Sequence, residues 1–234
     1  MKLNAPIISK KYQPIGFTII HEDPDLIIVN KDSGTLTVAA LWEKTKTVHA
    51  ALDSYVKKGN ALSKKIIYVV HRLDQATSGI LIFAKSEQVQ FFLKENWPTT
   101  VKHYYAIVHG KMKKKSDLIE SYLQEDEDYV VKSTTDSEKG KLARTEYSVV
   151  KETEHFSLLK INLLTGKKNQ IRVHLSEAGN PIVGDLKYGT KITRFKELML
   201  HSFSISIVHP HTKERVRIQA DVPLHFKKLI DYNY

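Results

Sequence analysis

The 234-residue sequence contains no cysteine. This absence excludes disulfides, thiolate metal sites and cysteine nucleophiles, and it is typical of a reducing compartment. The sequence also lacks any apolar run approaching the roughly 20 residues that span a bilayer. Its first residues, MKLNAPIISKKYQ, have neither the apolar core of a secretory signal nor the arginines of a transit peptide. We therefore predict a cytoplasmic protein that does not enter a membrane.

Several enzyme motifs are missing as well. The sequence has no Walker-type glycine loop, no GxGxxG, no GxSxG and no HExxH. Among the 11 histidines, His209 and His211 are the most suggestive pair, but no acidic residue is close by in their turn. We expect no metal site, and nucleotide hydrolysis and serine-hydrolase chemistry have no support.

Positive charge is in clear surplus. Lys and Arg number 36 against 26 Asp and Glu, for a formal net charge of +10 and a pI near 9.4. Such a surface attracts polyanions, of which RNA or DNA is the leading candidate. Charge alone is equally compatible with a basic protein that has no such partner.

The apolar pattern predicts many short strands with helices between them. Residues 1–16 are expected to be an extended lead-in, and residues 17–234 a single α+β domain with a largely antiparallel mixed sheet flanked by helices and loops. The helices are expected over residues 47–58, from 86 to before 98, over 170–178 and from 223. The strands are expected over residues 17–21, 26–29, 66–70, 80–84, 101–109, 118–123, 143–151, 156–164, 198–208 and 215–220.

One stretch stands out chemically, the connection between the expected strands 66–70 and 80–84. It holds Arg72, Asp74, Thr77 and Ser78 at the rim of a predicted sheet. A carboxylate next to a dry core needs a cation or hydrogen bonds to stay ionised. Arg72 and Asp74 are therefore either a structural ion pair or part of a site.

Two later stretches bear on that choice. Lys102, Tyr104 and Tyr105 place a cation and aromatic rings on a strand, where a ring either stacks on a base or simply packs in the core. Arg172 follows a lysine-bearing turn at the start of a predicted helix. It is either a partner for a carboxylate or phosphate, or part of a solvated basic helix start.

The stretch from His71 to Gly79 reads HRLDQATSG and matches the HRLDxxTSG signature of the RluA-type pseudouridine synthases. The sequence resembles that family from about residue 17 to 225. The further matching segments are Glu22 to Lys31, Lys102 to Ala106 with Gly110, Thr165 to His174, Gly179 to Asp185 with Tyr188-Gly189, Leu200 to Ser202 and His209-Pro210. The resemblance implies the pseudouridine synthase fold with a central RNA-binding cleft. Because residues 1–16 are too few for the S4 domain of many relatives, the chain resembles the shorter members with a catalytic domain only.

Two segments depart from the family pattern. Lys31-Asp32-Ser33-Gly34 replaces the usual Lys-Pro-Ala-Gly, and Gly166-Lys167-Lys168-Asn169-Gln170 replaces the usual Gly-Arg-Thr-His-Gln. Both changes flank the expected site and leave Asp74, Tyr104 and Arg172 in place. They bear on the choice of substrate more than on the reaction.

The resemblance implies isomerisation of uridine to pseudouridine in a structured RNA, without a cofactor and after the base is flipped out. Asp74 would be the essential carboxylate, either a nucleophile on sugar or base or a base that removes the 2′ proton. Tyr104 would stack on the uracil and assist proton transfer from C5, and Arg172 would pair with Asp74. The residues expected to contact RNA are His71, Arg72, Thr77, Lys31, Lys102, Lys167, Lys168 and Leu200.

The partner implied is ribosomal RNA, transfer RNA or both, and the protein is expected to be a monomer. The main alternative is a non-catalytic RNA-binding or ribosome-assembly protein that retains the synthase fold. The two departing segments favour that alternative, and the intact Asp74, Tyr104 and Arg172 set weighs against it.

Overall fold

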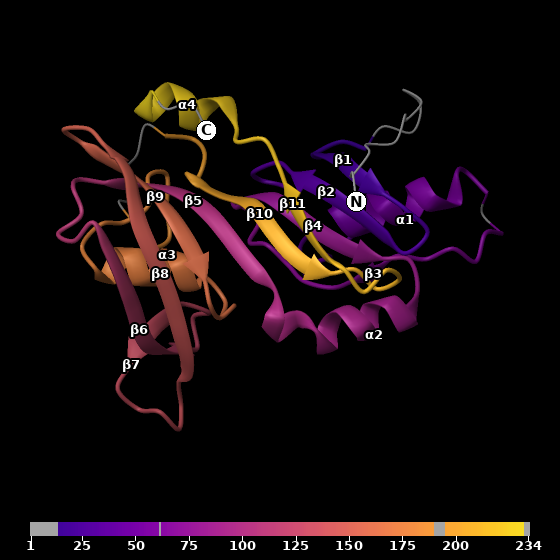
Figure 1. Cartoon of the computed structure of the whole chain (residues 1–234), viewed down its shortest axis with the longest axis horizontal. Helices are drawn as coiled ribbons and strands as arrows, with labels where there is room; N and C mark the ends of the chain where they lie inside the picture. Colours follow the sequence, from indigo (N-terminus) through magenta and orange to yellow (C-terminus); the bar gives the residue numbers. More distant parts are fainter. Residues whose placement is uncertain (1–13, 61, 190–194, 232–234) are drawn as a thin grey trace. The chain divides into compact units, whose positions relative to one another are not determined.

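The computed structural model describes residues 14–60, 62–189 and 195–231. Most of the expected lead-in, residues 1–13, therefore lies outside the described residues. The chain forms two compact units (Figure 1). Unit 1 consists of the described residues up to Thr100 together with Ser202–Asp221, and unit 2 of Val101–His201 together with the described residues from Val222. The expectation of a single catalytic domain over residues 17–234 stays a prediction.

Unit 1 is built on strands β1 (Phe17–Glu22), β2 (Leu26–Lys31), β4 (Ser78–Ala84) and β10 (Leu200–Val208), in that order across the sheet. Strand β3 (Tyr68–Val69) also pairs with β4, and β11 (Arg215–Gln219) pairs with β10. Strand β2 runs antiparallel to β4, with Leu26 opposite Ala84 and Lys31 opposite Gly79. This register places the lysine at the end of β2 beside the first residues of β4.

The core of unit 1 lies around β4, whose residues are all buried. Ile80 and Ile82 pack with Val89 and Leu93 of helix α2 (Glu87–Glu95), which leads into the short 3-10 helix η2 (Trp97–Thr99). Helix α1 (Val48–Lys57) begins after Thr47, whose side chain accepts a hydrogen bond from the Ala50 N–H as an N-cap. The predicted helices over residues 47–58 and from 86 are confirmed.

The prediction of a buried strand over residues 66–70 was wrong. Only Tyr68–Val69 forms β3, and Ile66 is 45% exposed. Side chains of α1 bind the backbone of this segment instead: the Asp53 carboxylate accepts the Ile67 N–H at 2.8 Å, and the His49 ring bonds the Ile67 carbonyl at 2.7 Å. Because these groups are already paired, strand pairing begins only at Tyr68.

Unit 2 contains strands in the order β5 (Val101–His109), β9 (Phe156–Leu163), β8 (Lys141–Glu152), β6 (Ser116–Glu125) and β7 (Val131–Thr134), with every neighbour antiparallel. Helix α3 (Gln170–Glu177) packs Val173 against Leu123, Val131 and Ala143. Helix α4 (Leu224–Ile230) follows Pro223. These elements confirm the expected strands and helices of this part of the chain, whereas β7 is a strand that the sequence did not predict.

Strands joined antiparallel and helices outside the sheets give the α+β class that the sequence predicts. None of the helices within the described ranges is long and apolar enough to cross a membrane.

Candidate functional site

The residues after β2 hold the loop between β3 and β4 by its backbone. Gly34 and Gln75 are joined twice, by the Gly34 N–H to the Gln75 carbonyl at 2.9 Å and by the Gln75 side-chain amide to the Gly34 carbonyl at 3.0 Å. The Thr37 hydroxyl donates to the Leu73 carbonyl at 2.9 Å and accepts the Leu73 N–H at 3.3 Å. The loop is thus fixed on both sides of Asp74.

Ser33 adds a contact at one of the two segments that depart from the family pattern. Its hydroxyl donates to the Ala76 carbonyl at 2.7 Å. The alanine that the family usually has at this position has no side-chain hydrogen-bond donor. The departure therefore strengthens the support of the loop instead of removing it.

Lys31 is the centre of this support. Its side chain is 1% exposed, and its Nζ donates to the carbonyls of Asp32 at 2.9 Å, Thr35 at 2.8 Å and Gln75 at 3.0 Å. An ammonium has three donors, so each carbonyl is matched by one of them. Sequence reasoning assigned Lys31 to the RNA backbone, whereas its surroundings suit a residue that positions the loop.

Burial lowers the pKa of Lys31 to about 7, although the nearby carboxylates of Asp32 and Asp74 act in the opposite direction. Between pH 7 and about 10.4, the unfolded lysine therefore binds a proton that the folded one has lost. We expect the unfolding free energy of the wild type, relative to Lys31→Met, to rise through this range. Below pH 7 both states carry the proton, so the difference should level off.

Urea denaturation at a series of pH values measures this difference. Lys94→Met, which removes an exposed lysine from α2, is the matched control and should give a difference that does not vary with pH. If the difference in unfolding free energy between the wild type and Lys31→Met also did not vary with pH, Lys31 would keep its charge over the whole range from pH 7 to about 10.4.

The other predicted residues of this loop differ in exposure. Arg72 is exposed, Asp74 is half-buried and Thr77 is 2% exposed. The His71 Nε2 accepts the Ile82 N–H at 3.1 Å, and its ring packs on Trp97 with centroids 4.6 Å apart. His71 therefore attaches the loop to β4, and its predicted contact with RNA stays a prediction.

Gly79 ends the HRLDQATSG stretch for a steric reason. Its φ is +115°, and a Cβ at this position would lie 2.2 Å from the Ser202 carbonyl oxygen. Any other residue would force β10 away from β4. The signature glycine thus preserves the close backbone approach that seats β4.

In unit 2, Arg172 forms a two-pronged ion pair with Asp185. Its Nε donates to Oδ2 and a terminal nitrogen to Oδ1, both at 2.8 Å, and its guanidinium lies 5.1 Å from the centre of the Tyr188 ring. The Asp185 Oδ1 also accepts the N–H groups of Lys187 and Tyr188. Burial raises the pKa of Asp185, but Arg172 and these N–H groups together hold it below the usual value.

Sequence reasoning missed Asp185 as a partner of Arg172. The signal was present, because the segment from Gly179 to Asp185 and Tyr188 formed part of the resemblance, but no role was assigned to it. Asp74 and Arg172 belong to different units, and their expected pairing stays a prediction.

The remaining predicted residues also lie in unit 2. Tyr104, 7% exposed, is opposite Ile161 on β9, and burial lowers the pKa of Lys102 two residues before it. Leu200, 3% exposed, is the first residue of β10, of which only Leu200 and His201 belong to unit 2. Lys168 is exposed and pairs with Glu125, and the Lys167 N–H donates to the Gln170 side chain at 3.0 Å.

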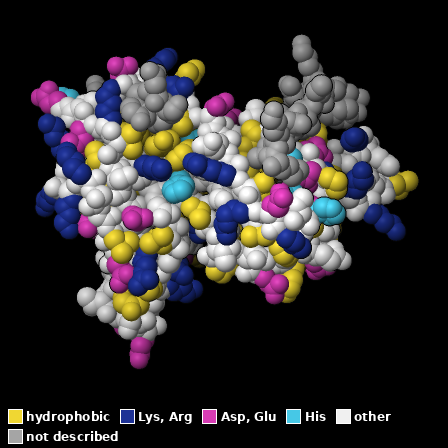
Figure 2. Space-filling model, viewed as in Figure 1, with side chains coloured by type: hydrophobic (Ala, Val, Ile, Leu, Met, Phe, Trp, Pro, Cys, Tyr) yellow, Lys and Arg dark blue, Asp and Glu magenta, His cyan; other side chains and the backbone are white. Residues whose placement is uncertain are grey.

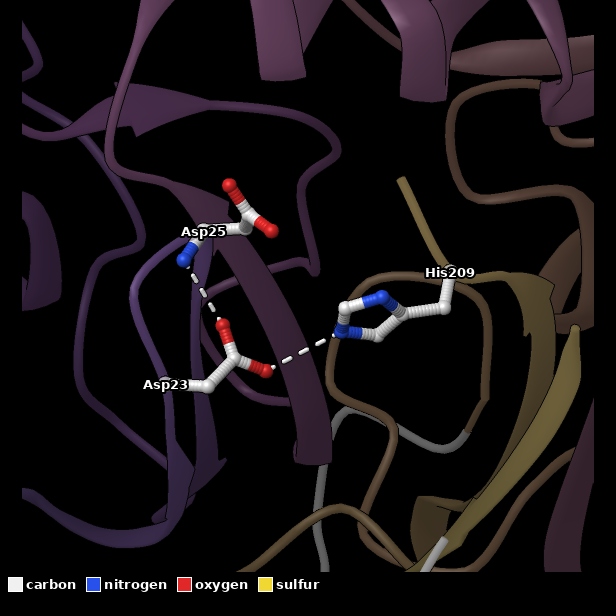
Figure 3. A group of neighbouring side chains, drawn as sticks. All are labelled: Asp23, Asp25 and His209. Carbon is white, nitrogen blue, oxygen red and sulfur yellow. Dashed lines mark hydrogen bonds and ion pairs between the residues drawn. The ribbon is translucent and has the colours of Figure 1, made fainter. Parts of the chain in front are cut away.

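A cluster outside the loop corrects one step of the sequence argument. His209 does have an acidic neighbour, because Asp23 of the turn between β1 and β2 lies 3.1 Å from its Nε2 (Figure 3). The same Asp23 Oδ2 bonds His21 at 2.7 Å, while Oδ1 accepts the N–H groups of Asp25 and Leu26.

These bonds engage both oxygens of Asp23. The His209 Nδ1 accepts the N–H groups of His211 and Thr212, so its proton sits on Nε2 and points at Asp23. Burial raises the pKa of Asp23, but the histidine and backbone donors hold it below its usual value. We interpret Asp23, Asp25 and His209 as a hydrogen-bonded junction between two turns.

Comparison with known proteins identifies the family. A family model described as RNA pseudouridylate synthase matches residues 25–177. The chain is 34% identical to the uncharacterized RNA pseudouridine synthase YhcT of Bacillus subtilis, over 90% of this chain and 70% of that protein. It is 32% identical to the ribosomal large subunit pseudouridine synthase C of Pasteurella multocida, over 98% of this chain and 72% of that protein.

Among solved structures, human RNA pseudouridylate synthase domain containing 4 is similar, with a TM-score of 0.74 at 22% identity, covering 89% of both chains. This likeness confirms the predicted fold. With the family model spanning most of the sequence and the HRLDQATSG signature in place, the chain belongs to the RNA pseudouridylate synthase family, in its RluA-type branch.

Proposed function

We propose that this RNA pseudouridine synthase uses Asp74 as its essential carboxylate on a uridine flipped out of a structured RNA. The observation that carries the assignment is the support of the Asp74 loop. Lys31, Ser33, Gly34 and Thr37 all bond its backbone, so the position of Asp74 is set by its neighbours along the loop. A half-buried carboxylate on a loop fixed in this way is pre-oriented for attack.

In the reaction, the bond between the uracil N1 and the ribose C1′ breaks, and the uracil turns while it is held. Its C5 then joins C1′ and loses a proton, and N1 takes up a proton. Asp74 acts either as the nucleophile that carries the sugar or the base, or as the base that removes the 2′ proton. Either route needs an ionised carboxylate, so a cation close to Asp74 favours both.

Arg172 and Tyr104 complete the proposed catalytic set. A guanidinium carries five N–H donors, and the two that bind Asp185 fix its plane. We propose Asp74 as a second acceptor for Arg172, which would keep that carboxylate ionised. Tyr104, buried on β5, would stack on the uracil and assist transfer of the C5 proton.

The proposed substrate is ribosomal RNA of the large subunit, and transfer RNA is the alternative. At least four relatives are named as ribosomal large subunit pseudouridine synthases, one of them 36% identical over 82% of this chain. Lys and Arg side chains are spread over the face that Figure 2 shows, in keeping with the net charge of +10. The proposed RNA contacts are Arg72, Lys102, Lys167 and Lys168. We propose that the enzyme acts as a cytoplasmic monomer. No comparison favours a non-catalytic role.

Mapping pseudouridines in total RNA from cells with and without the gene tests this function. We expect at least one site in large-subunit ribosomal RNA to disappear and to return when the wild-type gene is restored. Purified protein should restore the same site in RNA from the deletion strain, and added chelator should not reduce its rate. Identical maps from the two strains would contradict the proposal, and a loss confined to transfer RNA would contradict the ribosomal assignment.

A further inference from the structure

Residues 40–43 form a tight turn that presents two large apolar side chains to solvent. Ala40 and Glu43 exchange backbone hydrogen bonds of 2.8 and 3.3 Å, which leaves Leu41 and Trp42 at the tip. Leu41 is 96% exposed and Trp42 is 76% exposed. Single exposed apolar residues are common, but an adjacent Leu and Trp held on a turn present a continuous apolar surface that marks a contact site.

The turn is held in shape from within. The Glu43 Oε1 accepts the Thr45 N–H at 2.9 Å, the Thr45 hydroxyl at 3.0 Å and the Lys46 N–H at 2.9 Å. At its base, the Val48 N–H donates to the Leu36 carbonyl at 2.9 Å. A tip that is already ordered loses little conformational entropy when it binds.

The same segment supports the Asp74 loop. Thr37, which bonds Leu73 in both directions, lies five residues before Trp42. Five residues of extended chain span at most about 18 Å. The tip is therefore close enough to the loop to reach a neighbour of the flipped nucleotide.

The charges beside the tip indicate what binds there. Lys44 and Lys46 are both exposed, while one oxygen of the nearby Glu43 carboxylate, Oε1, is bonded within the turn. An exposed ring with cations beside it suits a nucleobase with its phosphates, because every base has a face that stacks on an aromatic ring. An anionic membrane would attract the same tryptophan and lysines, but the chain belongs to a family that acts on RNA, so RNA is the polyanion that we take to bind here.

We propose that Trp42 stacks on an unpaired base of the substrate RNA near the modified uridine, with Lys44 and Lys46 at the adjoining phosphates. The inference rests on the proposed function, since it takes the partner to be that enzyme's RNA. It adds a second point of RNA contact, apart from the residues that bind the flipped uridine. This contact would help to select the RNA sequence around the target uridine.

Binding of single-stranded oligouridylate to the full-length protein tests the inference. Trp42→Ala should weaken binding roughly 5- to 150-fold, the range for loss of one base–aromatic stack. Trp42→Phe should keep most of the affinity because it keeps a ring, whereas Trp42→Leu should lose it. Phe91→Ala removes a similarly exposed aromatic, 62% exposed on α2, and should leave binding unchanged.

Tryptophan emission gives a readout of stacking itself. RNA should quench the emission of the wild type more than that of Trp42→Phe, in which Trp97 is the remaining tryptophan. A duplex of the same length should quench less, because its bases are already stacked.

The outcomes separate this inference from the proposed function. A wild type that forms no pseudouridine in RNA from the deletion strain overturns the function. If the wild type does form pseudouridine, two results would overturn the role of Trp42 alone. One is that Trp42→Ala binds RNA as tightly as the wild type. The other is that Trp42→Ala loses no more quenching than Phe91→Ala. Circular dichroism identical to the wild type shows that the variants are folded, so a loss of binding would support the inference.

Discussion

Replacing Asp74 by asparagine is expected to abolish pseudouridine formation, with a loss on the order of 10⁴-fold or more in kcat. The amide has nearly the shape of the carboxylate but can neither attack carbon nor take a proton. The contacts from Thr37 to Leu73 and from Gly34 to Gln75 bind other residues of the loop, so the variant should fold. It should also bind RNA with an affinity close to that of the wild type.

Single-turnover assays on RNA from the deletion strain measure this effect. Asp32→Asn is the matched control, because Asp32 is a second carboxylate that acts on Lys31 but is exposed. Its rate should stay within about tenfold of the wild type. Turnover by Asp74→Asn at the level of the control would remove Asp74 from the mechanism.

Breaking the pair between Arg172 and Asp185 should produce the largest loss of stability. Asp185 is 2% exposed and Arg172 is 9% exposed, so Asp185→Asn leaves a buried guanidinium without its anion. We expect the unfolding free energy to fall by about 3–5 kcal/mol. Glu125→Gln breaks the exposed pair with Lys168 and should cost less than about 1 kcal/mol.

The pH dependence of this effect has a definite sign. Because the pKa of Asp185 is lowered in the fold, its contribution is present above the pKa of the unfolded carboxyl and is lost as the pH falls through the folded value. The difference between the wild type and Asp185→Asn should therefore shrink in acid. A difference that stays constant down to the folded pKa would contradict the assigned shift.

A double variant separates stability from catalysis. Arg172→Met with Asp185→Leu replaces the buried pair by apolar groups, and it should recover much of the stability that Asp185→Asn loses. Activity should not return, because the proposed cation for Asp74 is gone. If activity returned with stability, Arg172 would have a structural role only.

Secondary structure followed the sequence closely where local patterns decide it. Helix α1 begins after its Thr47 cap, and α2 after its Ser86 cap, as the spacing predicts. Strand β4 is buried throughout, which is why its residues 80–84 form an uninterrupted apolar run. The apolar run that begins at Ile66 predicted a buried strand in the same way. That strand does not form at Ile66 and Ile67, because the Ile67 backbone bonds side chains of α1 instead.

The sequence by itself determined the family, through the HRLDQATSG stretch, and the class of fold, through the periods of its apolar residues. Only the tertiary structure decided that Lys31 supports the Asp74 loop, that Asp185 holds Arg172, and that Asp23 meets His209. The physical reason is that periodicity reports neighbours along the chain, whereas Lys31 and Gln75, or Asp23 and His209, are brought together by strand order and register. Burial then gives these contacts their strength, and burial is a property of the folded chain.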